Sequence, residues 1–228
     1  MKRLMGYGLA LGWLLAIPAS ASLLYSNGAL NGQGDAWGID SYEVSDSFTV
    51  SSGATITAFN FVGWTDVGQL ITTVNWSIGT SPDGTNIASG TGAAVTASYD
   101  STATYGSGTY DINTYTVTGL SAALAGAGTY WLTLTGAVAS DAASGGRPFW
   151  DENDGPSAAY DDSTSLVNGG SIAACANGNS TCTGSETFNI FGNPTNGNFG
   201  GTLPEPGGMG LAGCGLLALA GALRRKMR

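Results

Sequence analysis

Short runs in which apolar and polar residues alternate dominate the central part of the chain, and no long segment repeats with a helical period. These runs are rich in Val, Ile, Thr, Phe, Tyr and Trp, and Gly, Asn, Asp, Ser and Pro separate them, which is typical of strands and turns. A period of two is what a half-buried antiparallel strand requires. The clearest runs, with the residues that share one face, are 44–50 (Val44, Phe48, Val50), 70–78 (Val74, Trp76, Ile78), 110–118 (Tyr115, Val117) and 128–135 (Tyr130, Leu132, Leu134).

Two segments depart from simple alternation. In residues 54–62, Ile56 faces inward, whereas Phe59 and Phe61 follow in the opposite phase. A β-bulge or bend near Ala58 would reconcile the two phases. Residues 121–127 are rich in alanine but short, so we expect a short helical or irregular connection there.

At least seven strands are predicted, because the short runs 149–150 and 188–191 add to those above. Short strands joined by turns indicate an all-β fold, and we predict an antiparallel β-sandwich that is jelly-roll-like. Residues 22–192 suit one such domain. Residues 193–202, with Gly, Asn, Pro and Thr, predict a flexible stalk after it.

The first 21 residues have the three parts of a secretory signal peptide. Lys2 and Arg3 form a basic start, and residues 4–17 form an uncharged apolar run. Ala19 and Ala21 then make a small-x-small cut site, which predicts cleavage after Ala21. The alternative is a buried N-terminal helix.

Residues 203–228 predict a C-terminal membrane segment. An uncharged stretch, 207–223, is long enough to just cross a bilayer, although it is short of the usual length. The basic cluster behind it should stay cytoplasmic, which places the central domain outside the cell. That cluster consists of Arg224, Arg225, Lys226 and Arg228.

The order of features in this tail resembles the PEP-CTERM sorting signal of exported bacterial proteins. Pro204, Glu205 and Pro206 precede the apolar stretch, and arginines close the chain. The resemblance implies processing by an exosortase, a membrane protease of transpeptidase type, at Pro204-Glu205-Pro206, in a setting of exopolysaccharide production. A plain single-span anchor is the alternative.

The central domain is similar to a recurring type of PEP-CTERM outer domain, which implies a secreted β-sandwich without an established activity. The matching pieces are Asp35-Ala36-Trp37, Ser45-Asp46-Ser47-Phe48, Trp76-Ser77-Ile78-Gly79-Thr80, Gly128-Thr129-Tyr130-Trp131-Leu132, Trp150-Asp151-Glu152-Asn153 and Ser185-Glu186-Thr187-Phe188-Asn189-Ile190-Phe191-Gly192.

The charge of the central domain excludes several function classes. Residues 22–203 contain fifteen acidic residues and a single basic one, Arg147, and the chain has no histidine. Such a surface repels nucleic-acid phosphates and anionic membranes. Catalysis by Ser-His-Asp or Cys-His groups lacks its base. Carboxylate and carbonyl oxygens remain, and they suit calcium.

Two cysteines and one acidic loop are candidate special sites. Cys175 and Cys182 are close in sequence in an exported chain, so we predict a disulfide between them. Asp151, Glu152 and Asp154 form the densest acidic segment and are candidate calcium ligands. A solvated turn is the alternative interpretation of this segment.

Aromatic residues are candidates for stacking on sugar rings. Trp131 alternates with the expected core residues, and Trp150 adjoins the acidic loop. These two indoles are therefore the best candidates for exposure and ligand binding, and the alternative is that they pack in the core as most tryptophans of a sandwich do.

Three functions remain open, and the first is the leading hypothesis. It is a non-enzymatic surface or extracellular-matrix protein that an exosortase-like protease processes and that associates with exopolysaccharide. The second is a carbohydrate-binding module with an aromatic or calcium site. The third is a glycoside hydrolase that pairs Glu152 with Glu43 or Glu186, although such carboxylates are more often ordinary surface charges.

Overall fold

The computed structural model describes residues 21–30, 36–141, 146–153, 155–157, 159–162, 172–174 and 184–195. Within these ranges the regular elements are all β-strands. They are β1 (Ser22–Ser26), β2 (Ala36–Gly38), β3 (Glu43–Val50), β4 (Ala54–Asp66), β5 (Ile71–Gly79), β6 (Ala88–Ala94), β7 (Thr96–Tyr105), β8 (Gly108–Leu124), β9 (Gly128–Ala139), β10 (Phe149–Asn153), β11 (Ala159–Asp162), β12 (Ile172–Ala174), β13 (Ser185–Glu186) and β14 (Phe188–Pro194).

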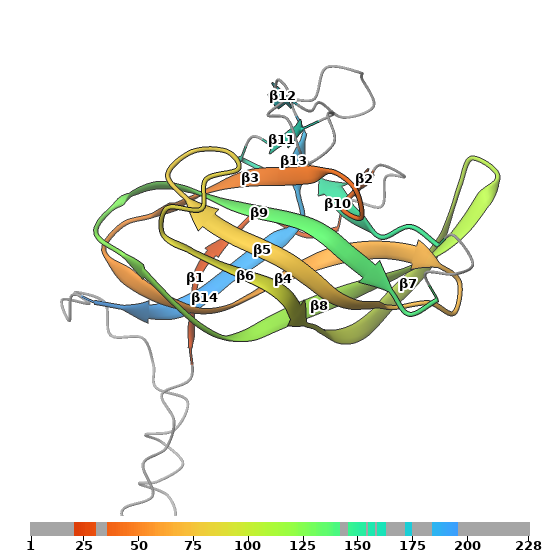
Figure 1. Cartoon of the computed structure of the whole chain (residues 1–228), viewed down its shortest axis with the longest axis horizontal. Helices are drawn as coiled ribbons and strands as arrows, with labels where there is room; N and C mark the ends of the chain where they lie inside the picture. Colours follow the sequence, from red (N-terminus) through yellow and green to blue (C-terminus); the bar gives the residue numbers. More distant parts are fainter. Residues whose placement is uncertain are drawn as a thin grey trace, which may run out of the picture. The chain divides into compact units, whose positions relative to one another are not determined.

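The strands form two antiparallel sheets, as the sequence predicts (Figure 1). In the first sheet the neighbours run β1-β14-β4-β10-β13, with β8 also on β4, β7 on β8, and β2 on β10. In the second sheet the order is β12-β11-β3-β9-β5-β6. The prediction of an all-β antiparallel fold is therefore confirmed.

Side chains from both sheets meet in one hydrophobic core. The rings of Phe59 on β4 and Trp76 on β5 pack edge to face at 6.1 Å, and those of Phe48 on β3 and Phe188 on β14 at 6.4 Å. Burial of each large apolar side chain contributes roughly 1.5–3 kcal/mol to the stability of the folded state. The residues predicted to face inward on 44–50, 70–78, 110–118 and 128–135 are all buried.

The predicted irregularity near Ala58 is confirmed. The register of β4 against β8 shifts between Ile56 and Ala58, and Ile56, Phe59 and Phe61 are all fully buried. Against β14, on its other side, β4 has one extra residue between Ile56 and Ala58, and this allows side chains of opposite phase to enter the same core.

The prediction of an irregular connection over 121–127 is wrong for most of that segment. Strand β8 continues to Leu124, and Ala122 pairs with Ile56 of β4. Ala122 and Leu124 are buried at alternate positions, so pairing with a long neighbour overrides the helical preference of the alanines.

The sequence analysis also does not predict β6 and β7, because their residues are small, polar and largely exposed.

The first and last strands place the two ends of the domain at one sheet edge. Strand β1 begins at Ser22, directly after the predicted cut site, and Ser22 pairs with Gly192 of β14. Strand β14 runs to Pro194, two residues into the segment predicted as stalk, and the backbone N–H of Thr195 donates to the carbonyl of Gly53 at 2.8 Å. The first compact unit of the chain ends at Thr195, and the residues after it lie outside the described ranges.

Several predicted features lie outside the described residues. They are Ala19 and most of the signal peptide, Cys175 and Cys182, Asp154, the rest of the stalk, and the sorting tail with its basic end. In the part of the chain that the structure does describe, no helix has the length and apolar character needed to cross a membrane.

Truncation of one core leucine should show how much the shared core contributes. Leu132 of β9 is 0% exposed, so Leu132→Ala is expected to lower the free energy of unfolding by about 2–5 kcal/mol. Val138 on the same strand is 44% exposed, so Val138→Ala is expected to cost less than about 0.5 kcal/mol. Equilibrium unfolding in urea measures both, and equal losses would contradict the assigned core.

Candidate functional site

A polar groove with a volume of about 310 Å³ lies on the second sheet. Most of its lining consists of hydroxyl, amide and carboxyl side chains, which come from β3, β5, β6, β9 and the loop between β5 and β6. The lining residues are Glu43, Asn75, Trp76, Ser77, Asp83, Thr85, Ser89, Gly90, Thr91, Thr133 and Thr135.

The alternation of the strands places these polar side chains on the face opposite the core. Thr133 of β9 lies between Leu132 and Leu134, both fully buried in the core. Because successive side chains of a strand point to opposite faces, Thr133 points out of the sheet. It pairs with Ser45 of β3 on one side and Ser77 of β5 on the other, so three hydroxyl side chains form a row across the sheet.

The loop between β5 and β6 folds over this face and forms one wall of the groove. Asp83 adopts a left-handed backbone conformation with φ of 54°, which Asp tolerates better than most residues. Its N–H donates to the hydroxyl oxygen of Ser45 at 2.9 Å, and the Ser45 hydroxyl donates to the Asp83 carboxylate. Ser77 holds the same loop by donating to the carbonyl of Gly84 at 3.1 Å.

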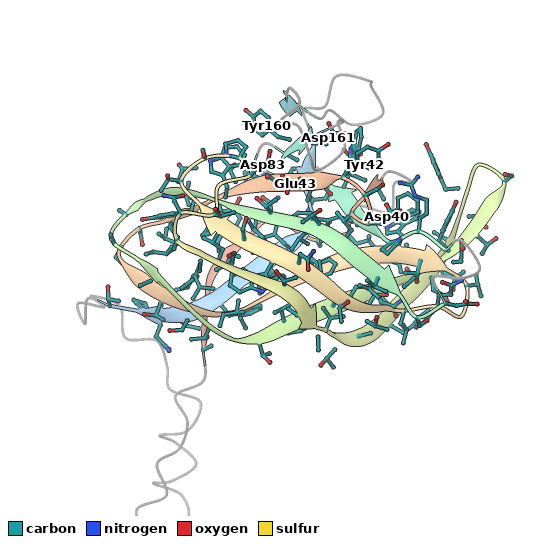
Figure 2. All side chains as sticks on the ribbon, in the orientation of Figure 1. Asp40, Tyr42, Glu43, Asp83, Tyr160 and Asp161 are labelled. Carbon is teal, nitrogen blue, oxygen red and sulfur yellow. The ribbon has the colours of Figure 1, made fainter. Side chains whose placement is uncertain are left out.

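An aromatic pair lies near the groove residue Thr133, on the same face of the sheet. Trp131 is half-buried and precedes Thr133 by two residues on the outer face of β9. Its ring packs edge to face on that of Tyr160, with centroids 5.0 Å apart. Tyr160 of β11 pairs with Ser45, so it lies beside the residue that holds Asp83. Figure 2 shows Tyr160, Asp83 and Glu43 in this part of the molecule.

The candidacy of Trp150 for exposure and ligand binding is wrong. Its side chain is 0% exposed, and its ring packs edge to face on Phe61 and Phe188. The indole N–H donates to the carbonyl of Thr187 at 3.1 Å. Alternation along β10 turns this residue toward the core, so Trp150 offers no face to a sugar.

Among the described residues, five carboxylates are almost completely buried elsewhere in the domain, on strands of both sheets. Each is at most 4% exposed, which is rare for ionisable residues. We call them the buried acidic cluster: Asp46 on β3, Asp151 and Glu152 on β10, Asp161 on β11, and Glu186 on β13.

Asp46 is held by hydrogen bonds to the surrounding chain. Its Oδ2 accepts from the side-chain amide of Asn27 at 2.9 Å and from the N–H of Glu186 at 2.6 Å. Its Oδ1 accepts from the N–H of Ser47 at 2.6 Å. Burial nevertheless raises the pKa of Asp46 to about 7, because desolvation outweighs these hydrogen bonds.

Two tryptophans hold the carboxylates of β10. Asp151 accepts from the indole N–H of Trp64 at 2.7 Å and from the hydroxyl of Thr187 at 2.6 Å. Glu152 accepts from the indole N–H of Trp37 at 2.7 Å. Both oxygens of Asp151 are thus engaged within the protein, which gives this predicted calcium ligand a structural role.

Glu186 lies directly opposite Glu152 in the pairing of β13 with β10. It is 0% exposed, and neither of its carboxyl oxygens has a hydrogen-bond partner. Burial raises the pKa of Glu186 well above its usual value, and the charge of Glu152 raises it further, followed by those of the other cluster members. Among the described residues, no group of three or more acidic, His or Cys side chains is arranged to hold a metal ion.

Of the two carboxylate pairs that the sequence offered for glycoside cleavage, the structure brings together Glu152 and Glu186 but not Glu152 and Glu43. Glu43 lines the groove, whereas Glu152 and Glu186 face each other out of reach of a polysaccharide. Sequence reasoning missed Asp46 as a site residue, although alternation already puts it on the face of Val44 and Phe48.

Comparison with known proteins assigns no family to this chain. No protein-family model matches it, and no curated protein sequence matches it. Its function is therefore inferred from its own residues.

The raised carboxyl pKa values predict that the folded protein loses stability as the pH rises. Between pH 3.8 and about 7, folded Asp46 keeps a proton that the unfolded chain has released. The contribution of Asp46 to the free energy of unfolding is therefore fully present below pH 3.8 and decreases as the pH rises to about 7. The decrease is on the order of 4 kcal/mol. Glu186 acts with the same sign.

Urea unfolding in the presence of a chelator, from about pH 4 to about pH 8, measures this dependence. A free energy of unfolding that rises across this window would contradict the assignment of the buried acidic cluster.

Proposed function

We propose that this chain is an exported bacterial surface or extracellular-matrix protein whose jelly-roll-like β-sandwich binds extracellular polysaccharide in the groove beside Trp131. The observation that carries the binding role is a groove lined by hydroxyl, amide and carboxyl groups, and the aromatic pair of Trp131 and Tyr160 lies on the same face of the sheet as its residue Thr133. The proposed role is non-enzymatic.

The chemistry of the groove matches that of sugars. Sugars present dense hydroxyl groups, which need both donors and acceptors, and Ser and Thr hydroxyls supply both. The carboxylates of Glu43 and Asp83 are acceptors for such hydroxyls, and charged acceptors make stronger hydrogen bonds. An indole face such as that of Trp131 suits the apolar face of a sugar ring, and the groove volume of about 310 Å³ falls in the range of ligand sites.

The ends of the domain support the proposed route of export. Cleavage after Ala21 would leave β1 complete, because the strand begins at Ser22. The pairing of Ser22 with Gly192 places both chain exits at one sheet edge, so a domain tethered at both ends before processing would keep one side toward the membrane. Pro204, Glu205 and Pro206 follow the last described residue, Thr195, by nine or more positions in the sequence, and an exosortase-like protease would act there.

Removal of the indole near the groove should weaken polysaccharide binding. Trp131→Ala is expected to raise the dissociation constant about tenfold, since loss of one stacking contact costs about 1.4 kcal/mol. Glu43→Gln should also weaken binding, because it replaces a charged acceptor. Co-sedimentation with the exopolysaccharide of the producing strain measures both constants.

Tyr99→Ala is the matched control for the stacking variant. Tyr99 is 62% exposed on β7 and does not line the groove, so this variant should bind like the parent. Equal binding by parent and Trp131→Ala, or no binding by the parent, would refute the proposed polysaccharide site.

Replacement of the central residue of the sorting motif should block processing. Glu205→Ala is expected to accumulate as an uncleaved precursor in the membrane fraction, because the proposed protease recognises Pro204-Glu205-Pro206. Thr202→Ala, close by but outside the motif, should be processed like the parent. Immunoblots of membrane and surface fractions give the result, and normal processing of Glu205→Ala would exclude this sorting route.

A further inference from the structure

The burial of Glu186 raises the question of what neutralises its carboxyl group. Its side chain is 0% exposed, and both of its carboxyl oxygens lack a hydrogen-bond partner. A buried carboxylate normally has its oxygens hydrogen-bonded or bound to a cation, because burial of a bare charge is very costly. The described residues do not supply such a partner for Glu186.

Between residues 22 and 203, the sequence leaves no second basic side chain to neutralise the buried acidic cluster. Arg147 is the single Lys or Arg between residues 22 and 203. Its guanidinium donates two hydrogen bonds to Asp40, both at 3.0 Å, and lies over the rings of Tyr42 and Phe149. Asp40 and Tyr42 are labelled in Figure 2. Asp40 thus occupies the one basic side chain of the domain.

We propose that a calcium ion binds in the buried acidic cluster, with Glu186 and Glu152 as its carboxylate ligands. The two residues are direct cross-strand partners, so their Cβ atoms start about 5 Å apart on one face of the sheet. Both side chains can therefore reach a common cation.

The ligand atoms present in the cluster favour a hard cation, which prefers oxygen ligands. The chain has no histidine, and the carboxylates near enough to act on Glu186 by their charge are those of Glu152, Asp46, Asp151 and Asp161. Calcium takes six to eight oxygen ligands in flexible geometry, so water and backbone oxygens can complete a site with two carboxylates. Magnesium requires a near-ideal octahedron and fits such a site less well.

The neighbours of the two ligands hold them in position. Trp37 donates to Oε1 of Glu152 at 2.7 Å, which fixes the orientation of that carboxylate. Asp46 accepts from the N–H of Glu186 at 2.6 Å, which fixes the backbone of the two-residue strand β13. Asp46 is therefore a positioning residue, and it links the site in the first sheet to β3 of the second.

Terbium, which replaces calcium at oxygen sites, tests the location of the ion. The full chain, purified in detergent and freed of metal by a chelator, is titrated with terbium while its tryptophans are excited. Because Trp37 contacts Glu152, we expect sensitised terbium emission that saturates and that calcium displaces. Glu186→Gln should abolish this emission, since it removes a ligand charge while keeping the shape of the side chain.

Two control variants separate this site from other acidic residues. Asp100→Asn removes an exposed charge on β7, and Glu43→Gln removes a charge from the groove. Both should keep the parent emission. Absence of sensitised emission in the parent, or parent-like emission in Glu186→Gln, overturns the proposal, whereas loss only in Glu43→Gln assigns the ion to the groove and overturns it as well.

The melting temperature gives a second and independent test. Calcium at about 100 times its dissociation constant is expected to raise the Tm of the parent by roughly 5–10 °C. Glu186→Gln should melt at or above the parent in chelator, since it lacks the buried charge, and should not respond to calcium. Circular dichroism verifies that the variant folds.

A parent that shows no calcium shift would mean that Glu186 is held as a neutral acid, and this result would refute the calcium site. Polysaccharide binding is measured separately, at the groove, so failure of one proposal leaves the other intact.

Discussion

The buried acidic cluster sets the main energetic constraint on this domain. Five carboxylates from β3, β10, β11 and β13 lie where water does not reach them, in a domain with one basic side chain. Hydrogen bonds from Asn27, Trp37 and Trp64 stabilise part of this charge. The remainder needs a proton or an external cation, so the stability of the fold depends on its surroundings as well as on its hydrophobic core.

Strand β3 connects this interior to the outer surface. Its successive residues Ser45 and Asp46 point to opposite faces: Ser45 holds the loop that walls the groove, and Asp46 holds the backbone of Glu186. A shift of this strand would disturb both places at once. The proposed ion site and the proposed polysaccharide groove therefore share a structural element, although they share no ligand.

The sequence predicts the core well because burial imposes strict alternation. Leu132, Leu134 and Phe48 follow it, and the bulge at Ala58 is visible as a change of phase. Trp150 shows the limit, because an indole beside acidic residues can equally face in or out, and only the neighbours of β10 decide. The pairing of Glu152 with Glu186 joins residues from distant strands, so no local pattern predicts it.

The pairing of β1 with β14 has a consequence for the order of folding. The hydroxyl of Ser22 donates to the carbonyl of Gly192, across a separation of 170 residues. Contacts this distant in sequence form slowly, since the intervening chain must first be brought together. The first strand to leave the ribosome must therefore wait for the last, and the sheet edge stays open until the whole domain has been synthesised.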